Sequence, residues 1–325
     1  MKQKLFNTIA IEIAASCNRR CKFCPVSVAP RPDELMPTNV YDAIIGELSA
    51  LQYSGRIEFY IYNEPMRHRA NLELCVAKAR SLTKAILMVS TNGDYMRSVD
   101  DLAWLYRIGV HQVVLNAYAQ GRYATFMQWK QQYEAQHGAL LTDAYTKIPY
   151  GKKALRVYDK ESPSAFGDGV FALQNRAGLI PDFLPPTTEP VSRMCVKPFR
   201  LMNINWRGEG MICCNDYYAD VPVGRIGKES VLDMWHGSIM SAYRASLLKK
   251  DRSLPLCRSC DCHSGAYPAA IDHGLVRDPA SSQHIEGIYA ARLEGRNASV
   301  CNTIVPETRV MLTTHGSDTS PPESA

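Results

Sequence analysis

Long hydrophobic runs are absent from this sequence of 325 residues. No stretch approaches the roughly 20 apolar residues that a membrane-spanning helix needs, so we expect no membrane partner. The basic residues are scattered and the formal net charge is only +5, which argues against nucleic-acid binding and allows at most an anionic ligand. A secretory signal is also missing, because Asn7 and Glu12 interrupt the apolar stretch before Cys17. We therefore expect a cytoplasmic protein.

Cysteine, by contrast, is abundant, with eleven residues. Without a secretory signal, metal or cluster ligation is a better explanation than disulfides. Only Cys75 and Cys301 stand alone, and we interpret them as core or surface thiols. The remaining cysteines fall in two groups. With 325 residues, 46% of them hydrophobic, the chain can form one large core and a smaller second module.

The first group, Cys17, Cys21 and Cys24, forms a C-x3-C-x2-C run directly after a short apolar segment. Three thiolates this close can bind three irons of a [4Fe–4S] cluster and leave the fourth iron open for a small molecule. A structural zinc site is the weaker alternative, because zinc requires a fourth ligand. The run therefore predicts a catalytic cluster.

The first half of the chain alternates between strand-like and helix-like patterns. Strands are expected over 9–13, 56–62, 85–89, 111–115 and 154–158, and helices at about 39–51, 72–82, 102–106 and 123–136. Repeated β-α units predict an α/β fold with a parallel sheet whose functional loops lie at the carboxyl ends of the strands.

Polar segments follow those strands. The second strand leads to Asn63-Glu64-Pro65, the third to Ser90-Thr91-Asn92-Gly93, and the fourth to Asn116. Each segment alone could be a turn or a helix start. Together with the cysteine run, they are expected to converge on one rim of the sheet.

This combination resembles the radical S-adenosylmethionine (radical SAM) superfamily, in which SAM chelates the open iron and is cleaved to a 5′-deoxyadenosyl radical. The resemblance implies a partial (β/α)6 TIM-like barrel, with its first units over 1–160 and the rest of the core and a bridge over 161–190. It implies a SAM-binding [4Fe–4S] cluster on Cys17, Cys21 and Cys24. The SAM contacts that it implies are Asn63, Glu64, Pro65, Ser90, Thr91, Asn92 and Asn116.

The second half carries the other cysteine group. An apolar run at 201–206, a turn with Gly208 and a second run at 211–214 predict a β-hairpin, and a helix is expected over 238–248. The cysteines around these elements are Cys195, Cys213, Cys214, Cys257, Cys260 and Cys262.

This order resembles the SPASM/Twitch extension of radical SAM enzymes, here over 191–273, in its short form with one auxiliary [4Fe–4S] cluster. The ligands it implies are Cys195, Cys213, Cys257 and Cys260. The doubled Cys213-Cys214 and the extra Cys262 leave the ligand open within each pair, and a structural zinc ribbon is the alternative. The polar, Pro- and Ser-containing extension at 274–325 is expected to be partly disordered.

The resemblance is closest to the small Twitch-bearing enzymes of aminoglycoside biosynthesis. It implies two [4Fe–4S] clusters and SAM as cofactors, a small polar substrate of aminosugar or cyclitol type, and a reducing donor such as flavodoxin or ferredoxin. The expected reaction is oxidation of an alcohol, with the auxiliary cluster as electron acceptor. Candidate substrate contacts are Arg156, Tyr158, Arg176 and Asp216.

Three alternatives stay open. In an epimerase, a thiol of Cys214 or Cys262 would return a hydrogen atom to the substrate radical, although both residues could equally be ligands or buried thiols. The substrate could also be a short peptide. A non-catalytic iron–sulfur or zinc protein would retain the metal, but it would have no use for the polar segments at successive strand ends.

Overall fold

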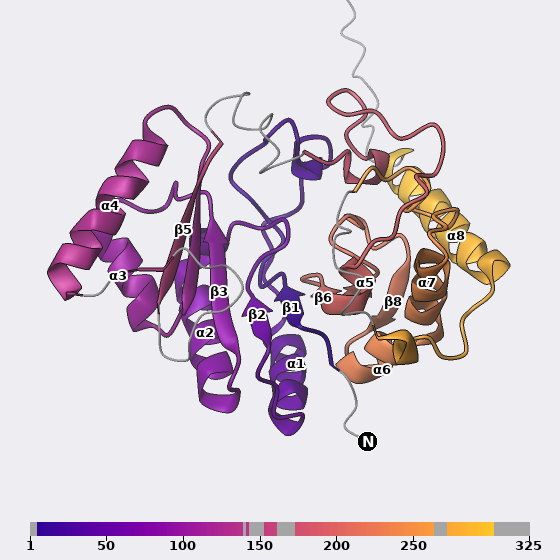
Figure 1. The fold of residues 1–325 in the computed structure, drawn as a ribbon, viewed down its shortest axis with the longest axis horizontal. Helices are drawn as coiled ribbons and strands as arrows, with labels where there is room; N and C mark the ends of the chain where they lie inside the picture. Colours follow the sequence, from indigo (N-terminus) through magenta and orange to yellow (C-terminus); the bar gives the residue numbers. More distant parts are fainter. Residues whose placement is uncertain (1–4, 139–140, 143–152, 161–172, 263–271, 302–325) are drawn as a thin grey trace, which may run out of the picture.

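The computed structural model describes residues 5–138, 141–142, 153–160, 173–262 and 272–301. Within them, one mixed sheet of eight strands runs through the molecule in the order β5-β4-β3-β2-β1-β6-β7-β8 (Figure 1). No helix among these residues is long and apolar enough to cross a membrane.

The N-terminal part consists of the predicted strand and helix units. Strands β1 to β5 are parallel neighbours, with bounds Thr8–Ile11, Arg56–Glu58, Ile86–Thr91, Gln112–Ala117 and Ala154–Asp159. The helices α1 to α4 between them are Thr38–Ala50, Arg69–Leu82, Val99–Arg107 and Arg122–His137. The sequence predicted each of these elements, with boundaries that differ by a few residues.

Side-chain alternation gives the sheet two different faces. Ile9, Ile57 and Leu87 lie in the core cluster that also contains Ile44 of α1 and Val76 of α2. Because successive side chains of a strand point to opposite faces, the residues between them face the other way. At the carboxyl ends that second face is polar and lines the cavity described below.

The sixth parallel strand, β6 (Leu201–Ile204), pairs with β1 rather than with β5. The α/β fold with a C-terminal cysteine-rich module is as predicted, and β1 to β5 stand in the sequential order of a partial barrel. The remainder of the core, predicted over 161–190, lies in part outside the described residues. Strand periodicity specifies which residues face the core and carries no information about which sheet edge receives a strand. That choice depends on the long connection after β5.

The predicted hairpin is present as β6 and β7 (Glu209–Met211), followed by β8 (Pro222–Arg225), and all three continue the sheet of the first half. The predicted domain boundary at 190/191 therefore separates two parts of one sheet. Helices α5 (Lys197–Arg200), α6 (Val231–His236) and α7 (Ser238–Leu248) pack beside it. The α7 helix has the predicted bounds.

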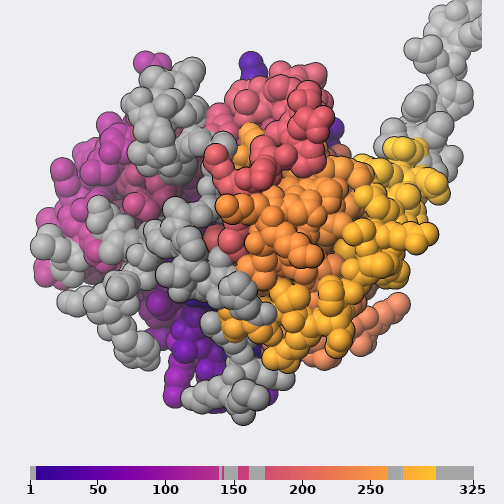
Figure 2. Space-filling model, turned by 45° about the vertical axis from the view of Figure 1, so that its right-hand side comes forward, coloured from indigo at the N-terminus to yellow at the C-terminus, as the bar shows by residue number. Residues whose placement is uncertain are grey.

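A last helix, α8 (Ser282–Cys301), was not predicted. It packs through the buried Ile285 and through ion pairs to the module, including Arg296 to Asp220 at 2.7 Å and Arg292 to Glu209 at 3.0 Å. Figure 2 shows it in yellow on the outer side of the C-terminal half. The terminal segment at 302–325, part of the extension expected to be partly disordered, lies outside the described residues.

Candidate active site

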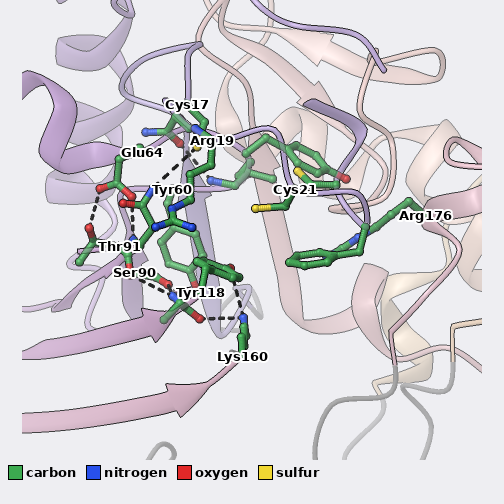
Figure 3. A pocket seen from close by; sticks show the side chains of 17 residues that line it. Cys17, Arg19, Cys21, Tyr60, Glu64, Ser90, Thr91, Tyr118, Lys160 and Arg176 are labelled. Atoms are coloured by element: carbon green, nitrogen blue, oxygen red, sulfur yellow. Dashed lines mark hydrogen bonds between the residues drawn. The ribbon is translucent and has the colours of Figure 1, made fainter. Parts of the chain in front are cut away.

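The carboxyl ends of the parallel strands surround a cavity of about 210 Å³ (Figure 3). Both the cysteine run and the polar strand ends line it, as the sequence predicted. The predicted residues in its wall are Cys17, Cys21, Cys24, Asn63, Glu64, Ser90, Thr91, Asn92, Asn116 and Arg176. Pro65 does not line the cavity; it begins the short 3-10 helix Pro65–His68.

The loop of Cys17, Cys21 and Cys24 is partly buried and internally braced. The Cys24 amide donates to the Cys21 carbonyl at 2.9 Å, and the Cys17 sulfur accepts from the Arg19 amide at 3.4 Å. Burial raises the pKa of Cys17 to about 11, and that of the other two thiols as well. The raised pKa values mean that a buried thiolate is costly. Metal ligation removes that cost, because the metal replaces the proton on the sulfur. The three cysteines therefore fit a cluster.

Glu64 joins two of the predicted SAM segments. One carboxylate oxygen accepts from the Thr91 hydroxyl at 2.6 Å and the other from the Asn92 amide at 2.8 Å. Burial raises the pKa of Glu64 to about 7, although these hydrogen bonds lower it. Glu64 thus fixes the position of the segment after β3.

The same segment is tied to the cysteine loop. The Asn92 side-chain amide donates to the Asn18 oxygen at 2.8 Å, and Asp94 accepts from Asn18 and from both Nε and Nη2 of Arg19 at 2.5–2.7 Å. The guanidinium of Arg19 also lies over the Tyr118 ring at 5.3 Å. The cysteine loop and the β3 end are therefore positioned as one unit.

The second cysteine group lines a separate cavity in the module. Cys195, Cys213, Cys257 and Cys260, the four predicted ligands, lie in its wall together with Cys262. Arg252 donates to the carbonyls of Cys260 at 3.2 Å and Cys262 at 2.9 Å, which fixes the loop that carries them. Among the described residues, no three His, Cys, Asp or Glu side chains lie close enough to share a single metal ion.

Cys214 lines neither cavity. Its sulfur accepts a hydrogen bond from the Lys197 ammonium at 3.2 Å, and its carbonyl accepts one from the hydroxyl of Tyr62, a residue of the first cavity. The geometry thus separates the Cys213-Cys214 pair, with Cys213 facing the second cavity. It does not separate Cys260 from Cys262.

Comparisons with known proteins match both halves of this arrangement. A family model described as an iron–sulfur cluster-binding domain, SPASM, matches residues 195–261. A curated relative from Niallia circulans, named S-adenosyl-L-methionine-dependent 2-deoxy-scyllo-inosamine dehydrogenase, is 26% identical over 262 residues, which are 79% of this chain and 94% of the relative. The chain is a radical SAM enzyme with a SPASM domain. The predicted cofactors, SAM and two [4Fe–4S] clusters, are supported by these matches.

Solved structures agree with this assignment. The crystal structure of BtrN in complex with AdoMet and 2-DOIA has 25% identity and a TM-score of 0.64, over 81% of this radical SAM enzyme and 95% of BtrN. The open conformation of BtrN has the same fold, with 23% identity and a TM-score of 0.56 over the same shares of the two chains.

Two further cations, Lys160 and Arg176, line the first cavity of this radical SAM enzyme. Lys160, directly after β5, donates to the Asn116 side chain at 2.7 Å, and burial and Arg176 lower its pKa to about 8. In Figure 3, Arg176 enters from the side away from Glu64 and Thr91. Its Nε is buried and has no hydrogen-bond acceptor in the part of the chain that the structure describes.

Arg176 stands on an unusual backbone. Arg176 and Ala177 have φ values of 51° and 58°, in the left-handed region that non-glycine residues avoid. Asn175 holds this turn, since its side chain accepts from the Ala177 amide and donates to the Ser259 carbonyl at 2.7 Å. Such strain persists only where the surrounding structure imposes it, and it is typical of functional sites.

Three of the four predicted substrate contacts, Arg156, Tyr158 and Asp216, do not line the first cavity. Arg156 lines a different cavity, of about 600 Å³, between α4 and β5, and its guanidinium lies over the Tyr158 ring. The fully buried Asp216 accepts from the amides of Asp220 at 2.7 Å and Val221 at 3.2 Å, and it lines neither cysteine cavity. These three predictions rested on closeness in sequence to a strand end or a cysteine, which does not determine where a side chain points.

Seven residues of the first cavity were not predicted from the sequence. These are Arg19, Phe23, Tyr60, Ile61, Tyr62, Tyr118 and Lys160. Lys160 could have been found by the rule that identified Asn116, because it lies two residues after the end of the predicted strand at 154–158. The aromatic residues carried no comparable signal.

Proposed function

We propose that this enzyme oxidises an alcohol of a small aminocyclitol-type substrate to a ketone, with the auxiliary [4Fe–4S] cluster as acceptor of the second electron and a base as acceptor of the hydroxyl proton. The observation that carries the proposal is Arg176, a cation whose buried Nε is unpartnered, in the wall of the SAM cavity. The name of the 26% identical relative, a 2-deoxy-scyllo-inosamine dehydrogenase, and the 2-DOIA bound in BtrN support the substrate class.

When bound, the reduced cluster and SAM supply a 5′-deoxyadenosyl radical that abstracts a hydrogen atom from an unactivated C–H bond. The residues of this chain bind and orient the reactants. Cys17, Cys21 and Cys24 would hold the cluster. Asn63, Ser90, Thr91, Asn92 and Asn116 would contact SAM, with Glu64 fixing Thr91 and Asn92. Pro65 would fix the turn after Glu64.

Arg176 would hold the substrate oxygen. Its guanidinium only donates hydrogen bonds, so it suits a hydroxyl that becomes a ketone. A fixed donor aimed at that oxygen also stabilises the negative charge that develops on it. Burial lowers the pKa of Arg176, but Tyr62, Cys214 and Cys24 outweigh burial and raise it. Arg176 therefore stays charged and lies close to both cysteine groups.

Epimerisation is the second candidate, and Cys214 favours it. This thiol lies outside the auxiliary-cluster cavity, and it is close enough to Arg176 to raise the pKa of that guanidinium. It could therefore return a hydrogen atom to a substrate radical held at Arg176. Cys262, in contrast, is 2% exposed and lines the auxiliary cavity, which suits a ligand or a core thiol.

Anaerobic reconstitution tests the proposal. About eight irons per chain are expected with both clusters, and reduction with SAM should yield 5′-deoxyadenosine. Absence of 5′-deoxyadenosine with both clusters present would indicate a non-catalytic iron–sulfur protein. A set of aminocyclitols should then yield a ketone without solvent deuterium, whereas deuterium at the reacting carbon would indicate epimerisation.

Arg176→Met tests the carrying observation. We expect it to keep its iron content and to lose ketone formation by at least about a hundredfold, as in removal of one transition-state donor. Arg207→Met, which removes an exposed arginine from the β6–β7 turn, is the matched control and should remain active. Unchanged ketone formation in Arg176→Met would refute the role of Arg176.

Two further parts of the proposal concern the electron donor and the cellular compartment. A low-potential donor such as flavodoxin or ferredoxin would reduce the SAM cluster. A reducing cytoplasm suits the many free thiols of the chain. Reduction by flavodoxin in place of a chemical reductant tests the donor.

A further inference from the structure

Lys197 lies in the wall of the auxiliary-cluster cavity, and its ammonium group is directed toward Cys214 at the border of that cavity. It begins α5, two residues after Cys195, and it is partly buried. Its Nζ donates to the Cys214 sulfur at 3.2 Å and to the Gln174 side-chain oxygen at 3.2 Å. This lysine plays no part in binding SAM or the substrate in the function proposed above.

The charge of Lys197 has no carboxylate partner. Every ion pair that the structure shows in its described part involves other residues. A partly buried cation is costly unless a negative group compensates it. The groups near this ammonium that can carry negative charge are its hydrogen-bond partner, the Cys214 sulfur, and the sulfurs of the cavity, those of Cys195, Cys213, Cys257, Cys260 and Cys262. The cation is therefore placed to compensate the charge of a cysteine-ligated cluster.

The other cation of this cavity is used differently. Arg252 donates to four backbone carbonyls, those of Arg193, Met194, Cys260 and Cys262. Its guanidinium is thus committed to holding the loop. Among the described residues, the Lys197 ammonium donates to no backbone carbonyl and has only the Cys214 sulfur and the Gln174 side-chain oxygen as partners.

We propose that Lys197 raises the reduction potential of the auxiliary [4Fe–4S] cluster. A cluster bound by four cysteinates is negative, and reduction adds one more negative charge. A nearby fixed cation stabilises the reduced state more than the oxidised state, because Coulomb attraction grows with the charge. Lys197 then acts through its fixed positive charge, without binding the substrate, and it makes the cluster a better electron acceptor. The inference rests on the auxiliary cluster of the proposed function.

The test is an anaerobic redox titration followed by electron paramagnetic resonance. The full chain carries Cys17→Ala, Cys21→Ala and Cys24→Ala, so that only the auxiliary cluster contributes. In this parent, Lys197→Met and Lys197→Gln should lower the midpoint potential by at least about 59 mV, a tenfold change in a one-electron equilibrium. Lys197→Arg, which keeps the charge, should shift it by less than half as much. Lys249→Met removes an exposed lysine at the end of α7 and should leave it unchanged.

Each outcome decides the proposal. A potential unchanged in both neutral variants, or one that Lys197→Arg lowers as far as they do, would overturn it. If the neutral variants lose the iron that Lys197→Arg retains, the need for a cation at the cluster is supported. Loss of iron in all three variants would mean a purely structural lysine. A parent without about four irons would refute the auxiliary cluster itself, which the iron count separates from the tuning.

Discussion

Arg31→Met is expected to destabilise the enzyme by about 3–5 kcal/mol, the typical cost of leaving a buried charge without its partner. The Arg31 Nη1 atom lies 2.6 Å from the Glu12 carboxylate, and the two side chains are 5% and 0% exposed. Among the described residues, the second Glu12 oxygen has no partner at hydrogen-bond distance, and the first also accepts from the Tyr62 amide at 2.9 Å. Besides Arg31, the amides of Tyr62 and Trp206 favour the charged carboxylate.

Arg31 also connects the two cysteine regions. Its guanidinium lies over the rings of Tyr217 at 3.9 Å and Trp206 at 4.5 Å, and it donates to the Tyr217 carbonyl. The Tyr217 hydroxyl in turn donates to the Ala29 carbonyl at 2.5 Å. The loss of Arg31 therefore weakens the contact between the SAM-cluster loop and the module, in addition to leaving Glu12 unpaired.

The effect depends on pH with a defined sign. Burial raises the pKa of Glu12 above 4.5, and Arg31 opposes that shift. In Arg31→Met the pKa of Glu12 rises further, so the native state binds a proton that the unfolded state has lost. Stability then falls as pH rises from about 4.5 through the folded pKa. The loss of unfolding free energy in Arg31→Met, relative to the wild type, should therefore be larger at pH 8 than at pH 5.

Urea unfolding of the iron-free protein, followed by circular dichroism, measures these differences. Arg67→Met is the matched control, because it breaks the more exposed Arg67–Asp33 pair near the same loop and should cost about 0–1 kcal/mol. Glu12→Gln should restore part of the stability of Arg31→Met. A cost for Arg31→Met no larger than the control, or no rescue by Glu12→Gln, would refute the reasoning.

Three further predictions concern the sites. Glu64→Gln leaves one of the donors from Thr91 and Asn92 without an acceptor, so we expect a loss of about 1–3 kcal/mol and a higher KM for SAM; an unchanged KM would contradict the positioning role of Glu64. Burial raises the pKa of Asp216 to about 7, so its contribution to the free energy of unfolding falls as pH rises from about 4 to 7. Asp216→Asn should remove this pH dependence in urea unfolding, and an equal pH dependence in the variant and the wild type would contradict the prediction. Cys213→Ala should lose the auxiliary cluster and about four irons, whereas Cys214→Ala should keep them; equal iron loss would show that the ligand choice within the pair is wrong.

Local patterns were sufficient for most of the fold. The 3.6-residue and two-residue periods predicted α1 to α4 and β1 to β5, since these elements bury one face against a common core. They could not predict α8, whose described contacts include ion pairs to Asp220 and Glu209, residues far away in sequence. They could not place β6 beside β1, because pairing partners are not encoded in the strand itself.

The sequence by itself determined the chemistry: the spacing of Cys17, Cys21 and Cys24, and the polar residues at strand ends, since the ends of parallel strands must meet at one edge. Only the tertiary structure decided which side chains lie in the two cysteine sites. It turned Arg176 into the cavity on a strained turn, directed Arg156 and Asp216 elsewhere, and brought Lys197 to the second cysteine group. The physical reason is that spacing along the chain constrains only near neighbours, whereas the direction of a loop side chain depends on contacts that close over long sequence separations.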